Sequence, residues 1–280
     1  MTRGRAPSPT PMLQHGLLLA AVVITLLPYA WMVSSSLKAN ADIVSDAIEL
    51  IPRHPILDNY IAAIAGTPVL TAILNSVIMA GGETILVVAT SVFTAYPFAR
   101  LRFRGRDTVF LLVLGSMMIP SQVTMIPTFI LMKWLGWIDT YHGLIVPRAV
   151  TPFGIFLMRQ FIAGVPDELI DAARVDGASE LLILFRIVAP SVAPAIAALT
   201  LFAFVYHWNS YLWPLTVLQG NSRSYPIVIS LSRLLSYNRG AMNTNLVMAG
   251  ATLAVLPPLV LFVLLQRFFV DSIVGSGVKG

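Results

Sequence analysis

Few side chains in this sequence have the type and spacing needed for chemistry. It contains no cysteine, which excludes disulfides, thiolate nucleophiles and thiolate metal sites. The four histidines stand far apart, without a paired metal-ligand spacing: His15, His54, His142 and His207. Glu83 lies near the middle of a long apolar stretch, directly after two glycines. A charge at membrane depth costs roughly 3 kcal/mol and is usually paired or functional.

Glu83 could be a hydrogen-bonded structural carboxyl or a solute contact, and the sequence leaves both open. An intramembrane enzyme would need a catalytic partner beside it, and no such partner is evident at helical spacing. Interhelical hydrogen bonding is the simpler expectation for Asn75 and Ser76, in the same apolar stretch. Asn75 is kept with Glu83 as a candidate for contact with a solute.

A second group of charged side chains lies in residues 168–190, ELIDAARVDGASELLILFRIVAP. Asp171 and Arg174 are three residues apart and can pair on one helix face. Gly177 suits the left-handed residue that ends a helix, and Ser179 can cap a second one. The spacing therefore predicts a helix, a glycine turn and another helix between two apolar segments.

The first of these helices is small and polar. It presents Asp171, Ala172, Ala173 and Asp176, with no evident intramembrane purpose. Small residues bordered by charges suit docking into the groove of another protein, but a solvated amphipathic loop would show the same pattern. Spacing alone does not decide between the two.

The segments that must position these groups are membrane-spanning helices. The chain has 280 residues, of which 57% are hydrophobic and 11% are charged, against about 25% charged in a soluble domain. The sequence predicts an all-α polytopic membrane protein, because each of six apolar segments is long enough to cross a bilayer. The six segments are 13–35, 69–97, 108–131, 143–163, 190–213 and 245–269.

The basic residues predict the orientation of these spans. Arg100, Arg102, Arg104 and Arg106 fill one short loop, which the positive-inside rule places in the cytoplasm. Both termini are then cytoplasmic, as a disordered tail over 1–12 and a C-terminal tail over 270–280 flanking a membrane domain over 13–269. The arginines serve topology and contact with membrane lipid, so we expect no nucleic-acid partner.

The fourth and fifth segments carry residues that interrupt helices, including Pro147 and Pro190. Interrupted spans are tolerated where protein or a water-filled cavity surrounds them. Near the outer end of the fifth segment, Trp208, Asn209 and Tyr211 combine aromatic faces with polar groups that suit a sugar. Interfacial anchoring explains the same aromatic residues equally well.

The 168–190 run resembles the signature loop of permease subunits in binding-protein-dependent ABC importers. That pattern is Glu-Ala-Ala, a glycine, and then Ile-x-Leu-Pro. Here it is matched by Asp171-Ala172-Ala173, Gly177 and Ile187-Val188-Ala189-Pro190, with aspartate in place of glutamate and alanine in place of leucine. Further stretches resemble the carbohydrate-importing branch, in particular the second permease subunit of maltose-type and glycerol-3-phosphate-type importers: LDNY, LNS, AYPFARLRFRGR, MMIP, FLMRQF and WNSYLWPL.

The resemblance implies a six-helix permease of the bacterial or archaeal inner membrane. Its cytoplasmic coupling helix, in a loop over 164–190 between the fourth and fifth spans, would sit in a cleft of a separate ATPase. Its partners would be a second permease subunit, two ATPase subunits and an extracytoplasmic solute-binding protein. Asp171 would pair with a basic ATPase residue, Ala172 and Ala173 would allow close packing, and Gly177 would make the turn.

The chain contains no G-x-x-x-x-G-K-[ST] phosphate loop. We therefore expect no enzymatic activity and no cofactor in this chain, with ATP and Mg²⁺ bound by the ATPase. Oligosaccharide, monosaccharide and glycerol phosphate all remain possible solutes. An autonomous channel or secondary transporter with Glu83 in its path is the alternative, and it would carry solute without ATP.

Overall fold

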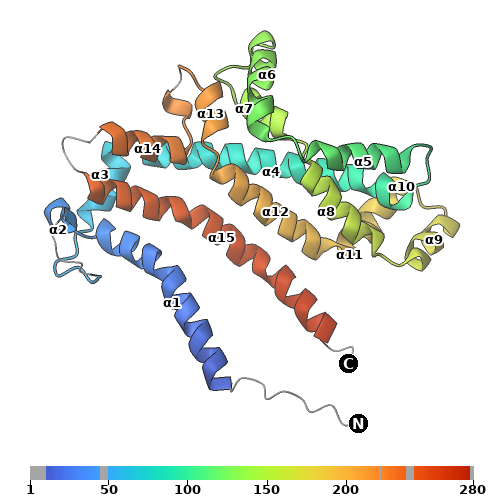
Figure 1. Cartoon of the computed structure of the whole chain (residues 1–280), viewed down its shortest axis with the longest axis horizontal. Coiled ribbons are helices and arrows are strands. Elements are labelled where there is room, and N and C mark those ends of the chain that lie inside the picture. Colours follow the sequence, from blue (N-terminus) through green and yellow to red (C-terminus); the bar gives the residue numbers. More distant parts are fainter. Residues whose placement is uncertain (1–10, 45–49, 221, 238–242, 278–280) are drawn as a thin grey trace. The chain divides into compact units, whose positions relative to one another are not determined.

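The computed structural model describes residues 11–44, 50–220, 222–237 and 243–277. Throughout this part of the chain the regular elements are helices (Figure 1), which confirms the all-α class. The expected disordered tail lies almost wholly outside the described residues. The expected C-terminal tail begins inside the last helix, which continues to Gly277.

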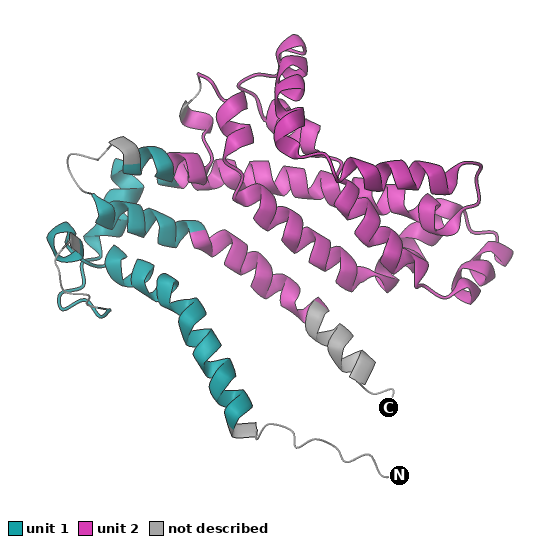
Figure 2. Ribbon diagram, viewed as in Figure 1, with its two compact units in different colours: residues 1–69, 231–254 teal, residues 70–230, 255–280 magenta. Residues whose placement is uncertain are grey.

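The chain divides into two compact units (Figure 2), and each is described by itself. Unit 1 comprises residues 1–69 and 231–254, and unit 2 comprises residues 70–230 and 255–280. Unit 1 contains three whole helices and parts of two others: α1 (Pro11–Ser36), α2 (Asn40–Val44), α3 (Asp58–Gly66), the end of α14 (Ile227–Tyr237) and the start of α15 (Thr244–Gly277).

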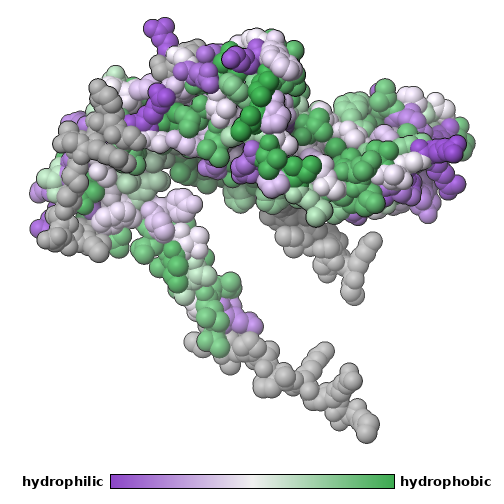
Figure 3. Space-filling model, turned by 45° about the horizontal axis from the view of Figure 1, so that its top comes forward, coloured by the Kyte–Doolittle hydropathy of each residue, from purple (hydrophilic) through white to green (hydrophobic). Residues whose placement is uncertain are grey.

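One asparagine connects three segments of unit 1. The Asn59 side-chain amide of α3 donates to the carbonyl oxygens of Ser36 and Lys38, 2.9 Å away in each case. Its carbonyl oxygen accepts from the Asn245 amide of α15 at 2.8 Å. Because Asn59 is buried, these bonds replace the water that its amide would otherwise bind. Hydrophobic side chains cover the exposed length of α1 (Figure 3), as expected for a helix that faces lipid.

Unit 2 holds the long helix α4 (Val69–Arg100) and the chain that folds along it. Its other elements, in order, are α5 (Arg106–Ser116), α6 (Ser121–Trp134), α7 (Tyr141–Ile145), η1 (Val146–Arg148), α8 (Pro152–Ala163), α9 (Asp167–Val175), α10 (Glu180–Ile183), η2 (Leu184–Val188), α11 (Ala189–Ser191), α12 (Ala193–Trp208), α13 (Leu212–Val217), η3 (Ser222–Ser224), the start of α14 and the end of α15.

The apolar segments are helical, but several of them are interrupted. Among the described residues, three helices are long and apolar enough to cross a membrane unbroken: Leu13–Ser36 in α1, Val69–Arg100, and Thr244–Phe268 in α15. Two bent pairs raise this number to as many as five. The bend between α11 and α12 is 81°, and the fourth predicted segment is divided among α7, η1 and the 12-residue α8. The predicted interruptions of these two segments are thus confirmed.

The third apolar segment differs from its prediction, because it is not one continuous helix. α5 and α6 meet at an angle of 97°. The break lies at Met117–Pro120, and Pro120 adopts an extended conformation just before α6. Proline has no N–H to continue the helical ladder and disfavours the helical conformation in the residue before it. Hydropathy alone could not reveal this bend, since the residues on both sides of it are apolar.

Two buried clusters hold the helices of unit 2 together. One joins the second half of α4 to α8, α9, α10 and α12, and includes Tyr96, Met158, Ile170 and Ile183. The other joins the first half of α4 to α6, α7, α13 and α14. In this second cluster the indole N–H of Trp213 donates to the Leu144 carbonyl oxygen at 3.1 Å.

The backbone at Trp137 packs so closely against position 143 in α7 that only glycine fits there. A Cβ atom at this position would overlap the carbonyl oxygen of Trp137, which cannot move without shifting the backbone. We expect Gly143→Ala to destabilise the protein by about 1–3 kcal/mol, the usual effect of overpacking. Thermal unfolding of the purified protein measures this change. Gly115→Ala is the matched control, because a Cβ there meets nothing within 4 Å; equal losses in both variants would refute the explanation.

Candidate functional site

The 164–190 loop folds as the sequence predicted, with α9, a glycine turn and α10 in succession. Asp167 and Glu168 occupy the first turn of α9, where the helix dipole favours negative charge. The Ser179 hydroxyl accepts a hydrogen bond from the Leu182 N–H at the start of α10. The helix–turn–helix prediction is therefore confirmed.

Gly177 ends α9 in the left-handed conformation, with φ +80°. Its N–H donates to the Arg174 carbonyl oxygen at 3.0 Å, and the Ala178 N–H donates to that of Ala173 at 2.9 Å. These two bonds make a Schellman motif, which satisfies the last carbonyl groups of a helix. Nothing lies within 4 Å of a Cβ placed on Gly177, so the backbone conformation and not crowding is what favours glycine here.

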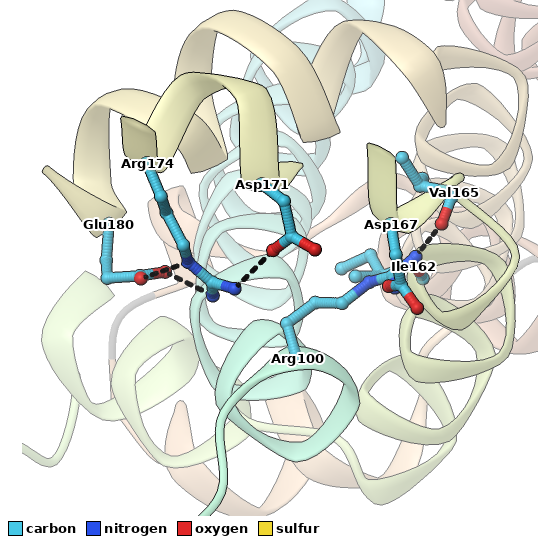
Figure 4. A network of polar contacts seen from close by, with 7 residues as sticks. All are labelled: Arg100, Ile162, Val165, Asp167, Asp171, Arg174 and Glu180. Carbon is cyan, nitrogen blue, oxygen red and sulfur yellow. Dashed lines mark hydrogen bonds and ion pairs between the residues drawn. The ribbon is translucent and has the colours of Figure 1, made fainter. Parts of the chain in front are cut away.

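Arg100, at the end of α4, anchors the start of this loop (Figure 4). Its guanidinium donates to the Ile162 carbonyl oxygen, from Nε at 3.0 Å and from Nη2 at 2.7 Å, and also to that of Val165. It forms an ion pair with Asp167. The side chain of Arg100 is only 8% exposed. From this one buried position it binds backbone carbonyl groups at and after the end of α8 and the carboxylate of the first residue of α9.

A second set of contacts starts at Arg174, in the last turn of α9 (Figure 4). Arg174 Nη1 lies 3.2 Å from an Asp171 carboxylate oxygen, which confirms the predicted pair. Arg174 Nε donates to Glu180 at 3.0 Å, and Glu180 also accepts a hydrogen bond from the Tyr96 hydroxyl of α4. The hydrogen bond to Glu180 raises the pKa of the Arg174 guanidinium.

The two faces of α9 differ in what they contact. Ile170 is buried and Ala173 packs against the same core cluster, so this side of the helix faces α4. Glu168, Ala172, Val175 and Asp176 are exposed, Val175 by 87%. At 3.6 residues per turn these four residues share the opposite face. The outer face is thus a small apolar centre flanked by carboxylates, and Ala173 is not part of it.

The remaining residues of the signature pattern lie where the chain turns into α12. Ile187 is half-buried in η2, and its carbonyl oxygen accepts from the Ser191 hydroxyl at 2.6 Å. Pro190 is exposed in α11, just before the bend. Both residues belong to the corner between the loop and the fifth apolar segment, and neither lies on the outer face of α9.

A buried cluster of charged and polar side chains lies in the apolar part of unit 2. Glu83 of α4 is fully buried. One of its carboxylate oxygens contacts Nδ1 of His207, although the approach lacks hydrogen-bond geometry. Arg148 Nη1 lies 3.8 Å from the same oxygen and donates to the Ser210 hydroxyl at 2.7 Å. The Arg148 guanidinium also lies over the Tyr206 ring, 5.3 Å from its centroid.

This cluster has no local sequence signature, because its members come from three separate elements. Glu83 has no partner nearby along α4, and the fold brings Arg148 from η1 and His207 from α12. One signal could have found it. Glu83 and Arg148 are opposite charges in apolar segments, where each needs a partner.

The other predicted path residues take different positions. The Asn75 amide donates to the Arg223 and Tyr225 carbonyl oxygens at 2.7 and 3.1 Å, and Ser76 accepts from the Ile227 N–H at 2.8 Å. Hydrogen bonding between segments is thus confirmed for both. Trp208 is buried and stacks on Phe204. Asn209 and Tyr211 are exposed, and the Asn209 amide donates to the Val205 carbonyl oxygen.

Long and broken apolar helices, with a polar helix–turn–helix between two of them, define a polytopic α-helical membrane protein. Residues 87–274 match the family of binding-protein-dependent transport system inner membrane components, and the chain belongs to that family. It is thus a membrane component of a transport system.

Several named relatives align along almost the whole chain. The arabinooligosaccharides transport system permease protein AraQ of Bacillus subtilis is 34% identical over 262 residues, which is 92% of each chain. The sn-glycerol-3-phosphate transport system permease protein UgpE of Pectobacterium atrosepticum is 33% identical, over 94% of this chain and 95% of its own. The osmoprotective compounds uptake permease protein GgtD of Synechocystis is 35% identical, over 95% of this chain and 91% of its own.

Solved structures share the fold. A chain of a bacterial ABC transporter involved in the import of the acidic polysaccharide alginate aligns with a TM-score of 0.80 and 23% identity, covering 94% of this chain and 100% of its own. A chain of a bacterial alginate transporter in complex with a pentasaccharide-bound periplasmic protein aligns with a TM-score of 0.62 and 16% identity, covering 92% of each chain. These likenesses support the same helical arrangement.

Proposed function

We propose that this chain is a permease subunit of an ATP-driven importer for a sugar or sugar-like solute. The observation that carries the proposal is the loop over 164–190, a polar helix anchored to α4 with an exposed outer face, in a chain of the binding-protein-dependent family. In this proposal α9 is the coupling helix, which docks on a separate ATPase. The two relatives named for arabinooligosaccharides and glycerol phosphate support a sugar-like solute.

The membrane arrangement proposed with this function has six spans, with both termini in the cytoplasm. Each bent pair then counts as one span, and α8 with the segments before it makes the fourth. The four arginines from Arg100 to Arg106 support a cytoplasmic position for their loop. Figure 3 supports the same placement, since hydrophilic side chains gather at the end of unit 2 that holds α9.

The proposed assembly contains a second permease subunit, two ATPase subunits that bind ATP and Mg²⁺, and an extracytoplasmic solute-binding protein. This chain would form half of the solute path and would catalyse no reaction itself. The family's dependence on a binding protein supports the last of these partners. The candidate contacts with the solute include two exposed residues, Asn209 and Tyr211. The other candidates are buried: Asn75, Glu83 and Trp208.

The outer face of α9 indicates the chemistry of the proposed ATPase groove. Asp167 and Asp171 already have ion-pair partners in this chain, Arg100 and Arg174. Among the described residues Glu168 and Asp176 have none, so their charges remain for a partner. We therefore propose a groove with an apolar floor for Ala172 and Val175 and a basic rim for the two carboxylates.

Val175→Asp tests the coupling role without disturbing the fold, because this side chain is 87% exposed. We expect the variant to insert normally and to lose most of its co-purifying ATPase, since a charge replaces the apolar centre of the contact. Affinity purification from the native membrane, with mass spectrometry of the bound proteins, gives the measurement.

The matched control is Leu181→Asp, a similar change at an exposed residue of α10 outside the α9 face. Undiminished ATPase recovery with Val175→Asp would show that α9 is not the coupling helix. A native chain that purifies alone and passes solute without ATP would favour the autonomous transporter instead, with the Glu83 cluster in its path.

A further inference from the structure

The contacts between the 164–190 loop and α4 are of a kind that resists relative movement. We propose that Arg100 and Tyr96 clamp the loop to α4, so that α9 and the adjoining end of α4 move as one body when ATP drives the transporter. Arg174 and Glu180 are then positioning residues that act through α4, not contacts with the ATPase. This inference rests on the proposed function. It adds how a movement of the ATPase would be transmitted from α9 to the membrane helix α4.

The first clamp holds the loop where α8 ends and α9 begins. Arg100 donates to the carbonyl oxygens of Ile162 and Val165 and pairs with Asp167. The planar guanidinium has five N–H donors in a fixed arrangement, so bonding in several directions restricts its orientation. Because Arg100 is nearly buried, these bonds are only weakly exchanged with water.

The second clamp holds the other end of α9. Tyr96 is buried in α4 and donates to Glu180, and Glu180 accepts from Arg174 in the last turn of α9. Tyr96 and Arg100 are four residues apart, so both project from one face of α4. The two ends of the α9 segment are therefore tied to adjacent turns of the same helix.

An apolar contact lies between the two clamps. Ile170 of α9 and Ile183 of α10 are buried in the core cluster that also contains Val92 and Ala95 of α4. Attachment at both ends and along its buried face restrains a short helix against both rotation and sliding. Without the polar clamps, the apolar contact alone would allow α9 to pivot, because apolar attraction is not directional.

The clamps also explain why a surface loop contains an arginine whose partners are internal. Arg174 contacts Asp171 on one side and Glu180 on the other. Its charge is balanced within the loop, and the outer face of α9 keeps only its acidic groups. Arg174 thus orients the loop and leaves the contact with a basic groove to other residues.

The test measures the distance between the loop and α4 in the assembled complex. Because the chain has no cysteine, Leu169→Cys on α9 and Phe93→Cys near the clamped end of α4, both exposed, give two specific sites for spin labels. Pulsed electron paramagnetic resonance then records their separation without nucleotide and with bound MgATP. We expect the same distance in both states for the native loop.

In a Tyr96→Phe/Glu180→Gln background we expect the distance to shift or broaden on ATP binding, since one clamp is lost while the size of the side chains is kept. A purely structural role would lower the stability of the complex and leave the distance in the assembled complex unchanged. Tyr96→Phe alone removes only a hydroxyl group and keeps the test available if the double variant fails to assemble.

Two results would contradict the proposed clamp. One is an ATP-dependent change of the distance between the two labels in the native background, and the other is an unchanged distance in the variants. Failure of the proposed function has a different signature, because the native chain would then bring no ATPase with it. That result appears at the purification step, before any distance is compared.

Discussion

Replacing Gly177 with proline should leave the chain inserted in the membrane and abolish ATP-driven solute uptake. Gly177 has φ +80°, whereas proline is held near −65°. Proline also removes the N–H that donates to the Arg174 carbonyl oxygen. Proline is destabilising where the native φ is incompatible with it and the N–H is hydrogen-bonded, and here the effect is concentrated at the junction between α9 and α10. The turn would rearrange and the outer face of α9 would no longer be held in its native direction.

Uptake into cells and the amount of inserted protein are measured in parallel. Gly164→Ala, at the other end of the loop, is the matched control, because Gly164 has a helical conformation with φ −84° and a Cβ there makes only a contact of 3.4 Å with Phe161. Gly177→Ala should give an intermediate loss, since a left-handed alanine costs about 1–2 kcal/mol. Normal uptake by an inserted Gly177→Pro chain would contradict the coupling role of the loop.

The loop could be predicted from sequence because its signals are local. Gly177, Ser179 and the Asp171–Arg174 pair each act over a single turn, and each takes the predicted position. The same local reasoning places the helices in the apolar segments. Hydropathy does not reveal the bend of 97° between α5 and α6, because the segments on both sides of Pro120 are apolar.

The orientation of α9 could not be predicted in the same way. The adjacent alanines 172 and 173 look equivalent in the signature pattern, and the resemblance assigns both to close packing with a partner. In the structure Ala173 packs on the core cluster and Ala172 is exposed. The direction of the helix depends on Tyr96 and Arg100, which lie about 70 residues earlier in the chain and whose contacts have no sequence signature.

These contacts connect two properties that sequence analysis treats separately. In the sequence, the four arginines from Arg100 to Arg106 indicate only the topology of the chain. Arg100 differs from its neighbours because it is nearly buried and bonds to the 164–190 loop, whereas Arg102 and Arg104 are exposed. One residue can therefore help set the orientation of the chain and also hold the loop to α4.

The Glu83 cluster should contribute more to stability than any exposed ion pair of this chain. Glu83→Gln would leave the Arg148 guanidinium, whose side chain is only 19% exposed, without its counter-charge. Breaking a buried pair from one side costs about 3–5 kcal/mol, whereas exposed pairs contribute about 0–1 kcal/mol. We expect the thermal midpoint of the detergent-solubilised protein to fall by several degrees. Size-exclusion chromatography after heating measures this midpoint. Asp107→Asn is the control, because the exposed Asp107 pairs with Arg106 at the start of α5.

A double-mutant cycle separates the charge pair from general damage to the core. Arg148→Gln alone would leave the buried Glu83 carboxylate uncompensated, and should destabilise the protein at least as much as Glu83→Gln. The double variant removes both charges, so its loss should be smaller than the sum of the two single losses. Strictly additive losses would mean that the two groups do not interact, even though Arg148 Nη1 lies 3.8 Å from the Glu83 carboxylate. Uptake by the double variant would then show whether the path needs these charges or only their balance. Retained uptake assigns the cluster to structure, and lost uptake in an inserted chain assigns it to the path.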